Sequence, residues 1–194
     1  MKKLAILFPG VGYTCVKPLL YYTASLASDH GYEIMKLDYG EDIHTFKGRS
    51  MEELEPLAEK IRSRVIAVLG EVKAEEYEDI LMISKSIGTV AACMAEKELG
   101  WHVRHFLMTP VPAAFPLLGD VEGCFVAGTA DPFTDAELIR KAAKKYPDKV
   151  GAIFEDCNHS LEKKGDTFAD LCNIKTVLDC MNTKIFDKGS RYPI

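Results

Sequence analysis

Several features that would place the chain in a specialised class are missing from its sequence. The six cysteines include no C-x-x-C pair, and most of them lie in apolar runs, where a free thiol behaves as a small hydrophobic side chain. Lysine and arginine form no cluster beyond short pairs such as Lys144-Lys145, and the net charge is −5. This weakly acidic balance argues against nucleic-acid and membrane partners. We also expect no cofactor and no metal.

No repeat, low-complexity tract or linker divides the 194 residues, so we expect one domain over residues 1–194. The N-terminal apolar stretch stops at Pro9, too early for the hydrophobic region of a signal peptide and its cleavage site. We therefore expect a cytoplasmic protein. Hydrophobic residues make up 47% and charged residues 27%, as in ordinary globular proteins with one sizeable core.

Short apolar runs alternate along the chain with longer runs in which apolar residues recur at helical spacing. The short runs predict strands at 4–8, 33–37, 80–83, 103–107, 123–127 and 151–154. The longer runs predict helices at 18–29, 51–69, 87–99, 135–145 and 167–181. This alternation indicates a doubly wound α/β domain, with a mostly parallel six-stranded sheet and helices on both faces.

The loops that follow the first and third strands are expected to face each other. If the second strand lies on one side of the first and the third on the other, a crevice opens above the carboxyl ends of strands one and three. The loop from Pro9 and the loop from Ser84 would border this crevice.

The first of these loops, Pro9-Gly10-Val11-Gly12, allows two interpretations. Two glycines after a strand, with Asp38 ending the next strand, are typical of a dinucleotide fold. However, Cys15 stands where that motif needs a third glycine, and Pro18 stands where the helix should already be running. Nucleotide binding therefore stays an alternative.

The second loop, Ser84-Lys85-Ser86-Ile87-Gly88, joins an apolar strand to a helix of small residues. This pattern is typical of a nucleophile elbow, in which a strained turn presents the central serine, here Ser86. Gly88 would allow the new helix to pack closely, while Ser84 replaces the more common glycine. A helix N-cap is the simpler interpretation of Ser86. For Lys85 we expect an exposed, solvated side chain, with attraction of an anionic substrate as the alternative.

An acid and a histidine follow Ser86, each in a loop after a separate strand, which is the chain order of an α/β-hydrolase triad. Thr134-Asp135-Ala136-Glu137 is typical of a capping box with Thr134 as N-cap, which leaves Asp131 as the preferred acid and Asp135 as the alternative. His159 is preferred as the base, against a surface or capping histidine, because the other histidines lie in no such loop. Those other histidines are His30, His44, His102 and His105.

At these residues the sequence resembles the α/β-hydrolase superfamily, in particular its small capless members similar to dienelactone-hydrolase-like esterases. The matching segments are 84–88, 128–132 and 158–161, with 9–12 at the place of the family's His-Gly oxyanion loop. Pro9 replaces that histidine, the family's two leading antiparallel strands look absent, and dienelactone hydrolases have cysteine in place of Ser86. The resemblance implies an oxyanion hole formed by the main-chain N–H groups of Ile87 and Val11, with Gly12 as a further donor.

The resemblance predicts a serine hydrolase that cleaves a small soluble ester or thioester through Ser86, His159 and Asp131 and an acyl-enzyme. The segment 108–120 is too short for a large cap, so we expect an open pocket. Its expected walls are Tyr13, Pro110, Phe115 and Phe133, each with core or loop packing as the alternative. The loop 39–50 is expected to be a flexible surface connection, or a segment that closes over the crevice. A non-catalytic binding protein of the same fold is the other alternative.

Overall fold

Six strands form one sheet in the computed structural model, which describes residues 2–44 and 51–187. The strands run parallel in the order β2-β1-β3-β4-β5-β6. Their bounds are β1 Lys2–Phe8, β2 Tyr32–Lys36, β3 Tyr77–Lys85, β4 Arg104–Met108, β5 Glu122–Gly128 and β6 Val150–Phe154. The predicted doubly wound sheet is confirmed, including β2 and β3 on opposite sides of β1.

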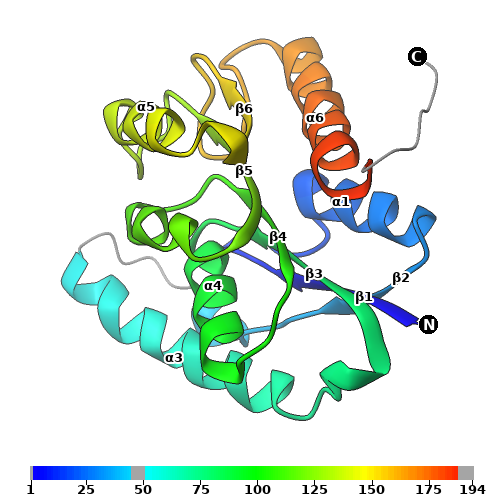
Figure 1. The fold of residues 1–194 in the computed structure, drawn as a ribbon. Coiled ribbons are helices and arrows are strands. Elements are labelled where there is room, and N and C mark those ends of the chain that lie inside the picture. The colour runs from blue at the N-terminus through cyan, green and yellow to red at the C-terminus, as the bar shows by residue number, and fades with distance from the viewer. Residues whose placement is uncertain (1, 45–50, 188–194) are drawn as a thin grey trace.

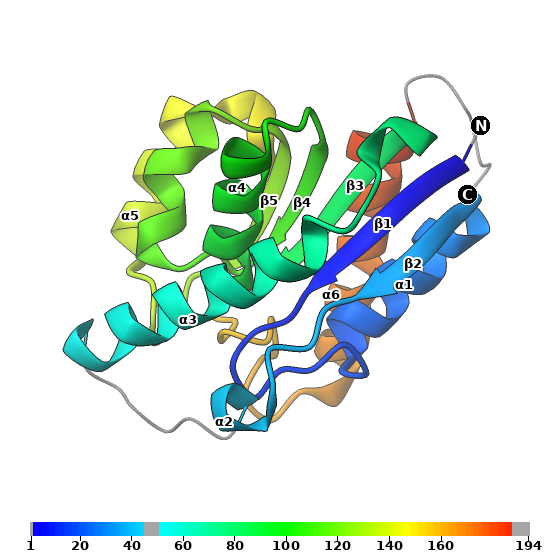
Figure 2. The same ribbon diagram turned by 90° about the horizontal axis from the view of Figure 1, so that it is seen from below.

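Helices cover both faces of the sheet. The helices are α1 Pro18–Asp29, α2 Glu41–His44, α3 Met51–Leu69, α4 Ile87–Leu99, α5 Ala136–Lys145 and α6 Thr167–Met181. Short 3₁₀ segments lie at η1 Ala74–Glu76, η2 Pro112–Gly119 and η3 Pro147–Lys149, and a π-helical turn lies at η4 Asn182–Phe186. Figures 1 and 2 show α1 and α6 side by side on one face and α3, α4 and α5 on the other. Within the described ranges, no helix is long and apolar enough to cross a bilayer.

Alternation along β1 explains why this strand needs cover on both sides. Ala5 and Leu7 pack in the cluster with residues of α1 and α6, whereas Leu4, Ile6 and Phe8 pack in the cluster with residues of α3 and α4. Successive strand side chains point to opposite faces, so an uninterrupted apolar strand must be buried twice.

The N-terminus of α5 corrects one expectation. Asp135, and not Thr134, is the N-cap, because the Asp135 carboxylate accepts a hydrogen bond from the N–H of Glu137 at 2.7 Å. Thr134 is buried, and its hydroxyl donates instead to the carbonyl of Pro110 at 3.0 Å. Burial forces this hydroxyl to find a partner on the neighbouring strand-end loop.

The segment after β2 corrects another expectation. The flexible surface connection predicted for 39–50 is wrong over residues 39–44, because α2 forms there and Tyr39 and Ile43 are buried in the α3/α4 cluster. Asp42 of α2 accepts a hydrogen bond from Arg64 of α3 at 2.8 Å. Residues 45–50 of this prediction lie outside the described residues.

The carboxyl ends of the strands gather the candidate loops at one edge of the sheet. β1 ends at Phe8, β3 at Lys85, β5 at Gly128 and β6 at Phe154, and the parallel register aligns Phe8 with Ser84. All loops that carry the predicted site residues begin at this edge.

Candidate active site

Ser86 lies in a strained turn between β3 and α4. Its φ of 58° and ψ of −129° belong to a region that residues with a side chain rarely adopt. Ser86 occupies the N-cap position of α4, but its side chain makes no capping hydrogen bond. The alternative role as an N-cap therefore does not account for this serine, whose geometry is that of a nucleophile elbow.

Two glycines make room for this turn. A Cβ on Gly10 would lie 2.9 Å from Cβ of Ser86 and 3.5 Å from its Oγ, so the β1 loop touches the serine itself. A Cβ on Gly88 would lie 2.4 Å from the carbonyl oxygen of Phe8. Side chains at these positions would push the elbow away from β1, which explains why both positions carry glycine.

Asp131 and His159 form a hydrogen-bonded pair beyond β5 and β6. Nδ1 of His159 lies 2.6 Å from Oδ2 of Asp131, and the Asp131 side chain is only 1% exposed. The other carboxylate oxygen accepts a hydrogen bond from the N–H of Phe133 at 2.8 Å. Both oxygens are thus held, and the Asp131 contact fixes the ring orientation and leaves Nε2 facing away from it.

Main-chain packing holds the two loops together. The N–H of Ala130 donates to the carbonyl of Cys157 at 2.9 Å, and a Cβ on Gly128 would lie 2.4 Å from that same oxygen. Asn158, next to His159, accepts hydrogen bonds from the N–H groups of Ser160 and Glu162. These contacts make the loop of residues 155–166, here called the histidine loop, a compact turn.

Nε2 of His159 is buried and has no hydrogen-bond partner among residues 2–44 and 51–187, so it is not hydrogen-bonded to Ser86. Burial lowers the pKa of His159, the Asp131 hydrogen bond opposes this effect, and the positive charge of Lys85 adds to it. The imidazole is therefore neutral near pH 7, with Nε2 available as a base.

Two of the predicted oxyanion donors, Val11 and Gly12, directly follow Gly10, and the third, Ile87, directly follows Ser86. Gly10 and Tyr13 exchange main-chain hydrogen bonds of 3.1 and 3.3 Å, a pair that does not involve the N–H groups of Val11 and Gly12. Ile87 is the first residue of α4, so its N–H has no acceptor within the helix. The helix N-terminus also favours negative charge at this point.

Lys85 differs from the sequence expectation of an exposed side chain, because it is completely buried. Its ammonium donates to the Thr109 hydroxyl at 3.1 Å and to the main-chain carbonyl of His159 at 2.9 Å, and it lies 4.3 Å from the centre of the Tyr13 ring. Lys85 continues the alternation of Leu81 and Ile83, which face the α1/α6 core. This alternation is the sequence signal that would have predicted its burial.

Of the residues expected to form the pocket walls, Phe133 is exposed, whereas Phe115 and Pro110 are buried. Phe133 is 58% exposed, and its ring packs edge to face against the His159 ring, with the two ring centres 4.8 Å apart. The prediction that Phe115 forms a pocket wall is wrong. Phe115 lies on η2 and packs in the core against Phe125, with the two ring centres 5.9 Å apart. Pro110 is also buried, and the Tyr13 ring packs beneath Lys85 with its hydroxyl accepting the N–H of Leu19.

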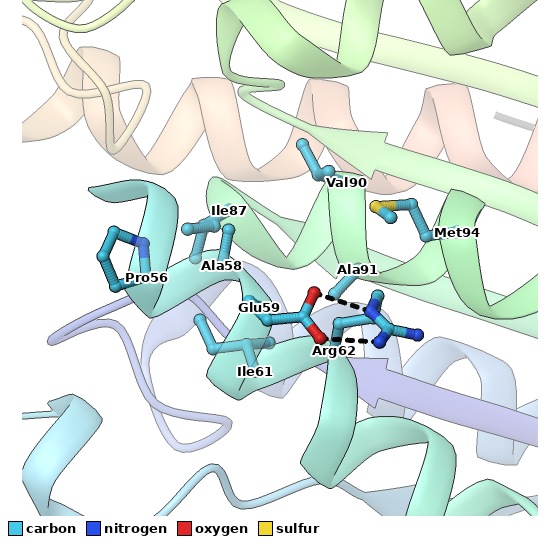
Figure 3. Close-up of a pocket in the computed structure, with 9 residues that line it drawn as sticks. All are labelled: Pro56, Ala58, Glu59, Ile61, Arg62, Ile87, Val90, Ala91 and Met94. Atoms are coloured by element: carbon cyan, nitrogen blue, oxygen red, sulfur yellow. Dashed lines mark hydrogen bonds and ion pairs between the residues drawn. The ribbon is translucent and has the colours of Figure 1, made fainter. Parts of the chain in front are cut away.

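A groove that the sequence did not predict runs between α3 and α4. Its volume is about 600 Å³. Ile87, the residue after Ser86, lines it together with Pro56, Val90 and Met94, and the Glu59–Arg62 ion pair borders it (Figure 3). The groove is not visible in the sequence, because it depends on how two helices pack.

No protein-family profile and no curated protein matches the sequence. Solved structures match over nearly the whole chain. A serine hydrolase homologue of the alpha/beta class from Coxiella burnetii has a TM-score of 0.64 and 13% identity, over 92% of this chain and 84% of that one. A lidless serine hydrolase from Xanthomonas campestris has a TM-score of 0.59 and 13% identity, over 93% and 81%. An esterase from Pyrococcus furiosus has a TM-score of 0.56 and 12% identity, over 94% and 83%.

The chain therefore has the α/β-hydrolase fold, and its resemblance to that superfamily and to capless members is confirmed for the fold. It has a compact form of this fold, in which η2 is the sole helical element between β4 and β5.

Proposed function

We propose that the protein is a serine hydrolase that cleaves an ester or thioester of a small soluble substrate. The observation that carries the proposal is the buried His159–Asp131 pair, which shares one sheet edge with a serine held in an elbow conformation. His159 takes the proton of Ser86 as its hydroxyl attacks the carbonyl, and Asp131 stabilises the imidazolium. Water then releases the acyl group.

The Ser86–His159 hydrogen bond of this mechanism forms in the substrate complex. Catalytic hydrogen bonds are commonly long in free enzymes and shorten when substrate is bound. The N–H groups of Ile87 and of Val11, with Gly12 as a further donor, stabilise the oxyanion. One such donor contributes about 3 to 4 kcal/mol to the transition state.

The two arms of the substrate lie on opposite sides of Ser86. His159 must protonate the leaving group, so the leaving group lies on its side, against the exposed face of Phe133. The acyl chain extends the other way, past Ile87 into the groove between α3 and α4. From Ile87 to Met94 this path is roughly 10 Å long, which suits short and medium acyl chains.

Replacement of the nucleophile tests the proposal directly. We expect Ser86→Ala to abolish hydrolysis of p-nitrophenyl butyrate and labelling by a fluorophosphonate probe. The matched control is Ser84→Ala. Ser84 lies on β3, two residues before Ser86, and its buried hydroxyl has no hydrogen-bond partner within the described ranges. Undiminished hydrolysis by Ser86→Ala would remove this residue from the role, and a wild-type protein that neither hydrolyses esters nor reacts with the probe would favour a binding protein of the same fold.

The acid is tested by a pair of conservative changes. Asp131→Asn should lower kcat about 10⁴-fold, because it favours the wrong tautomer of His159. Asp135→Asn is the control: asparagine caps helices as well as aspartate does, so activity and stability should both stay at the wild-type level. A large loss of kcat in Asp135→Asn, with Asp131→Asn unaffected, would reverse the assignment.

A further inference from the structure

Lys85 is buried, and its side-chain nitrogen contacts residues of three loops at the candidate site. Its ammonium carries three N–H groups, and three acceptors surround it: the Thr109 hydroxyl, the carbonyl of His159 and the π face of Tyr13. These acceptors come from the loops after β4, β6 and β1. No carboxylate is among its hydrogen-bonding partners in the described part of the chain, so the position is not a simple ion pair.

Thr109 shows that the contact is built into the fold. Its φ is 44°, an uncommon conformation for a β-branched residue, and it is completely buried. The turn places its hydroxyl 3.1 Å from the Lys85 ammonium. A strained residue is retained only where its surroundings enforce it, so this partner of Lys85 is held in place.

We propose that Lys85 is a positioning residue for the catalytic histidine, because its side-chain nitrogen holds the main-chain carbonyl of His159 in the turn that carries the imidazole. When Lys85 is protonated, its positive charge also favours the neutral form of that imidazole. This inference rests on the proposed function.

The charges around Lys85 are consistent with this role. Burial lowers the pKa of Lys85 to about 7, while the carboxylates of Asp131 and Glu162 oppose that effect. On acidification from neutral pH, Lys85 therefore becomes fully charged, and its charge lowers the pKa of His159. The titratable groups that face the ammonium from the surrounding loops are Tyr13, Asp131, His159 and Glu162.

The decisive variant is Lys85→Met, which keeps the length of the side chain and removes the charge. We expect kcat to fall. In the plot of kcat against pH, the acidic limb, where activity is lost as His159 becomes protonated, should move about one pH unit upward, because the imidazole protonates more readily without the nearby charge. Lys85→Arg retains the charge and should leave the limb at its wild-type position. A merely structural role would lower kcat in Lys85→Met without moving the limb, and that result would overturn the proposal.

Lys149 provides a matched control. Its ammonium likewise donates to two main-chain carbonyls, of Leu118 and Val121, and lies 5.9 Å from the Tyr146 ring. Lys149→Met should therefore leave the acidic limb of kcat where it is in the wild type. A limb that moved equally in Lys149→Met would also overturn the proposal.

A measurement without substrate separates this inference from the proposed function. The pKa of His159, followed by NMR of its ring carbon, should be higher in Lys85→Met than in the wild type, whether or not any ester is cleaved. In the wild type alone, the Lys85 and His159 resonances should titrate as a coupled pair, which tests the proposal even if a variant does not fold. Independent titration of the two groups would overturn it.

Discussion

At the scale of single residues, backbone strain marks the candidate site. The non-glycine residues with positive φ in the described part of the chain are Ser86, Thr109, Asp156 and Leu161. All lie beyond the carboxyl end of a strand or within the histidine loop. Each such residue costs on the order of 1 to 3 kcal/mol, which the surrounding packing must offset. Strain concentrated at one edge of a sheet is typical of a site that needs fixed side-chain directions.

Gly10 allows a test of how closely the β1 loop must approach Ser86. Gly10→Ala adds a methyl group 2.9 Å from Cβ of Ser86, so the elbow or the loop has to move. We expect kcat to fall roughly 10- to 100-fold, because even a small displacement of the reacting groups lowers the reaction rate strongly. The control is Gly31→Ala, where no atom lies within 4 Å but φ is +82°. It should lower the free energy of unfolding without lowering kcat, and equal kcat values for the two variants would contradict this account.

Single residues also differ in how far their roles can be predicted from the sequence. Ser86, Asp131 and His159 could be chosen as candidates from the sequence, because each follows a strand and together they keep the chain order of an α/β-hydrolase triad. The hydrogen-bond partners of Lys85 and the hydrogen bond from Thr134 to Pro110 depend on contacts between loops that are far apart in the sequence. Local patterns contain no information about such contacts.

At the scale of elements, the groove between α3 and α4 is the feature with the clearest functional consequence. Val90→Trp fills the groove one turn beyond the elbow, so kcat/KM should fall at least about 10-fold for p-nitrophenyl octanoate and little for the acetate. Val68→Trp is the control, because Val68 is exposed on α3 and does not line the groove. Equal losses for both esters would show that the acyl chain does not use this path.

The elements themselves followed closely from hydrophobic periodicity. Predicted strand 103–107 corresponds to Arg104–Met108, and predicted helix 87–99 to α4 Ile87–Leu99. The short elements α2 and η2 were not predicted, because they contain few residues and their formation depends on burial of side chains such as Ile43 and Phe115.

At the scale of the whole molecule, the buried cation makes folding stability depend on pH. In the folded state Lys85 loses its proton above about pH 7, whereas in the unfolded chain it keeps the proton to about 10.5. Between these values the unfolded state binds the additional proton of Lys85, so the contribution of Lys85 makes the free energy of unfolding increase as pH rises through this window.

Urea unfolding at two pH values measures this effect. Between pH 7.0 and 8.5 we expect the free energy of unfolding of the wild type to increase by roughly 1 to 2 kcal/mol more than that of Lys85→Met. Lys149→Met should behave as the wild type does. An equal change in the wild type and Lys85→Met would show that Lys85 stays charged throughout the window.

The short connection between β4 and β5 has a consequence for the acyl-enzyme of the proposed mechanism. Because η2 packs into the core and Phe133 remains largely exposed, the side from which the leaving group departs stays accessible to solvent. Any small alcohol or amine that reaches this side competes with water for the bound acyl group. Added methanol should therefore divert part of the product from free acid to methyl ester, as a transferase would do.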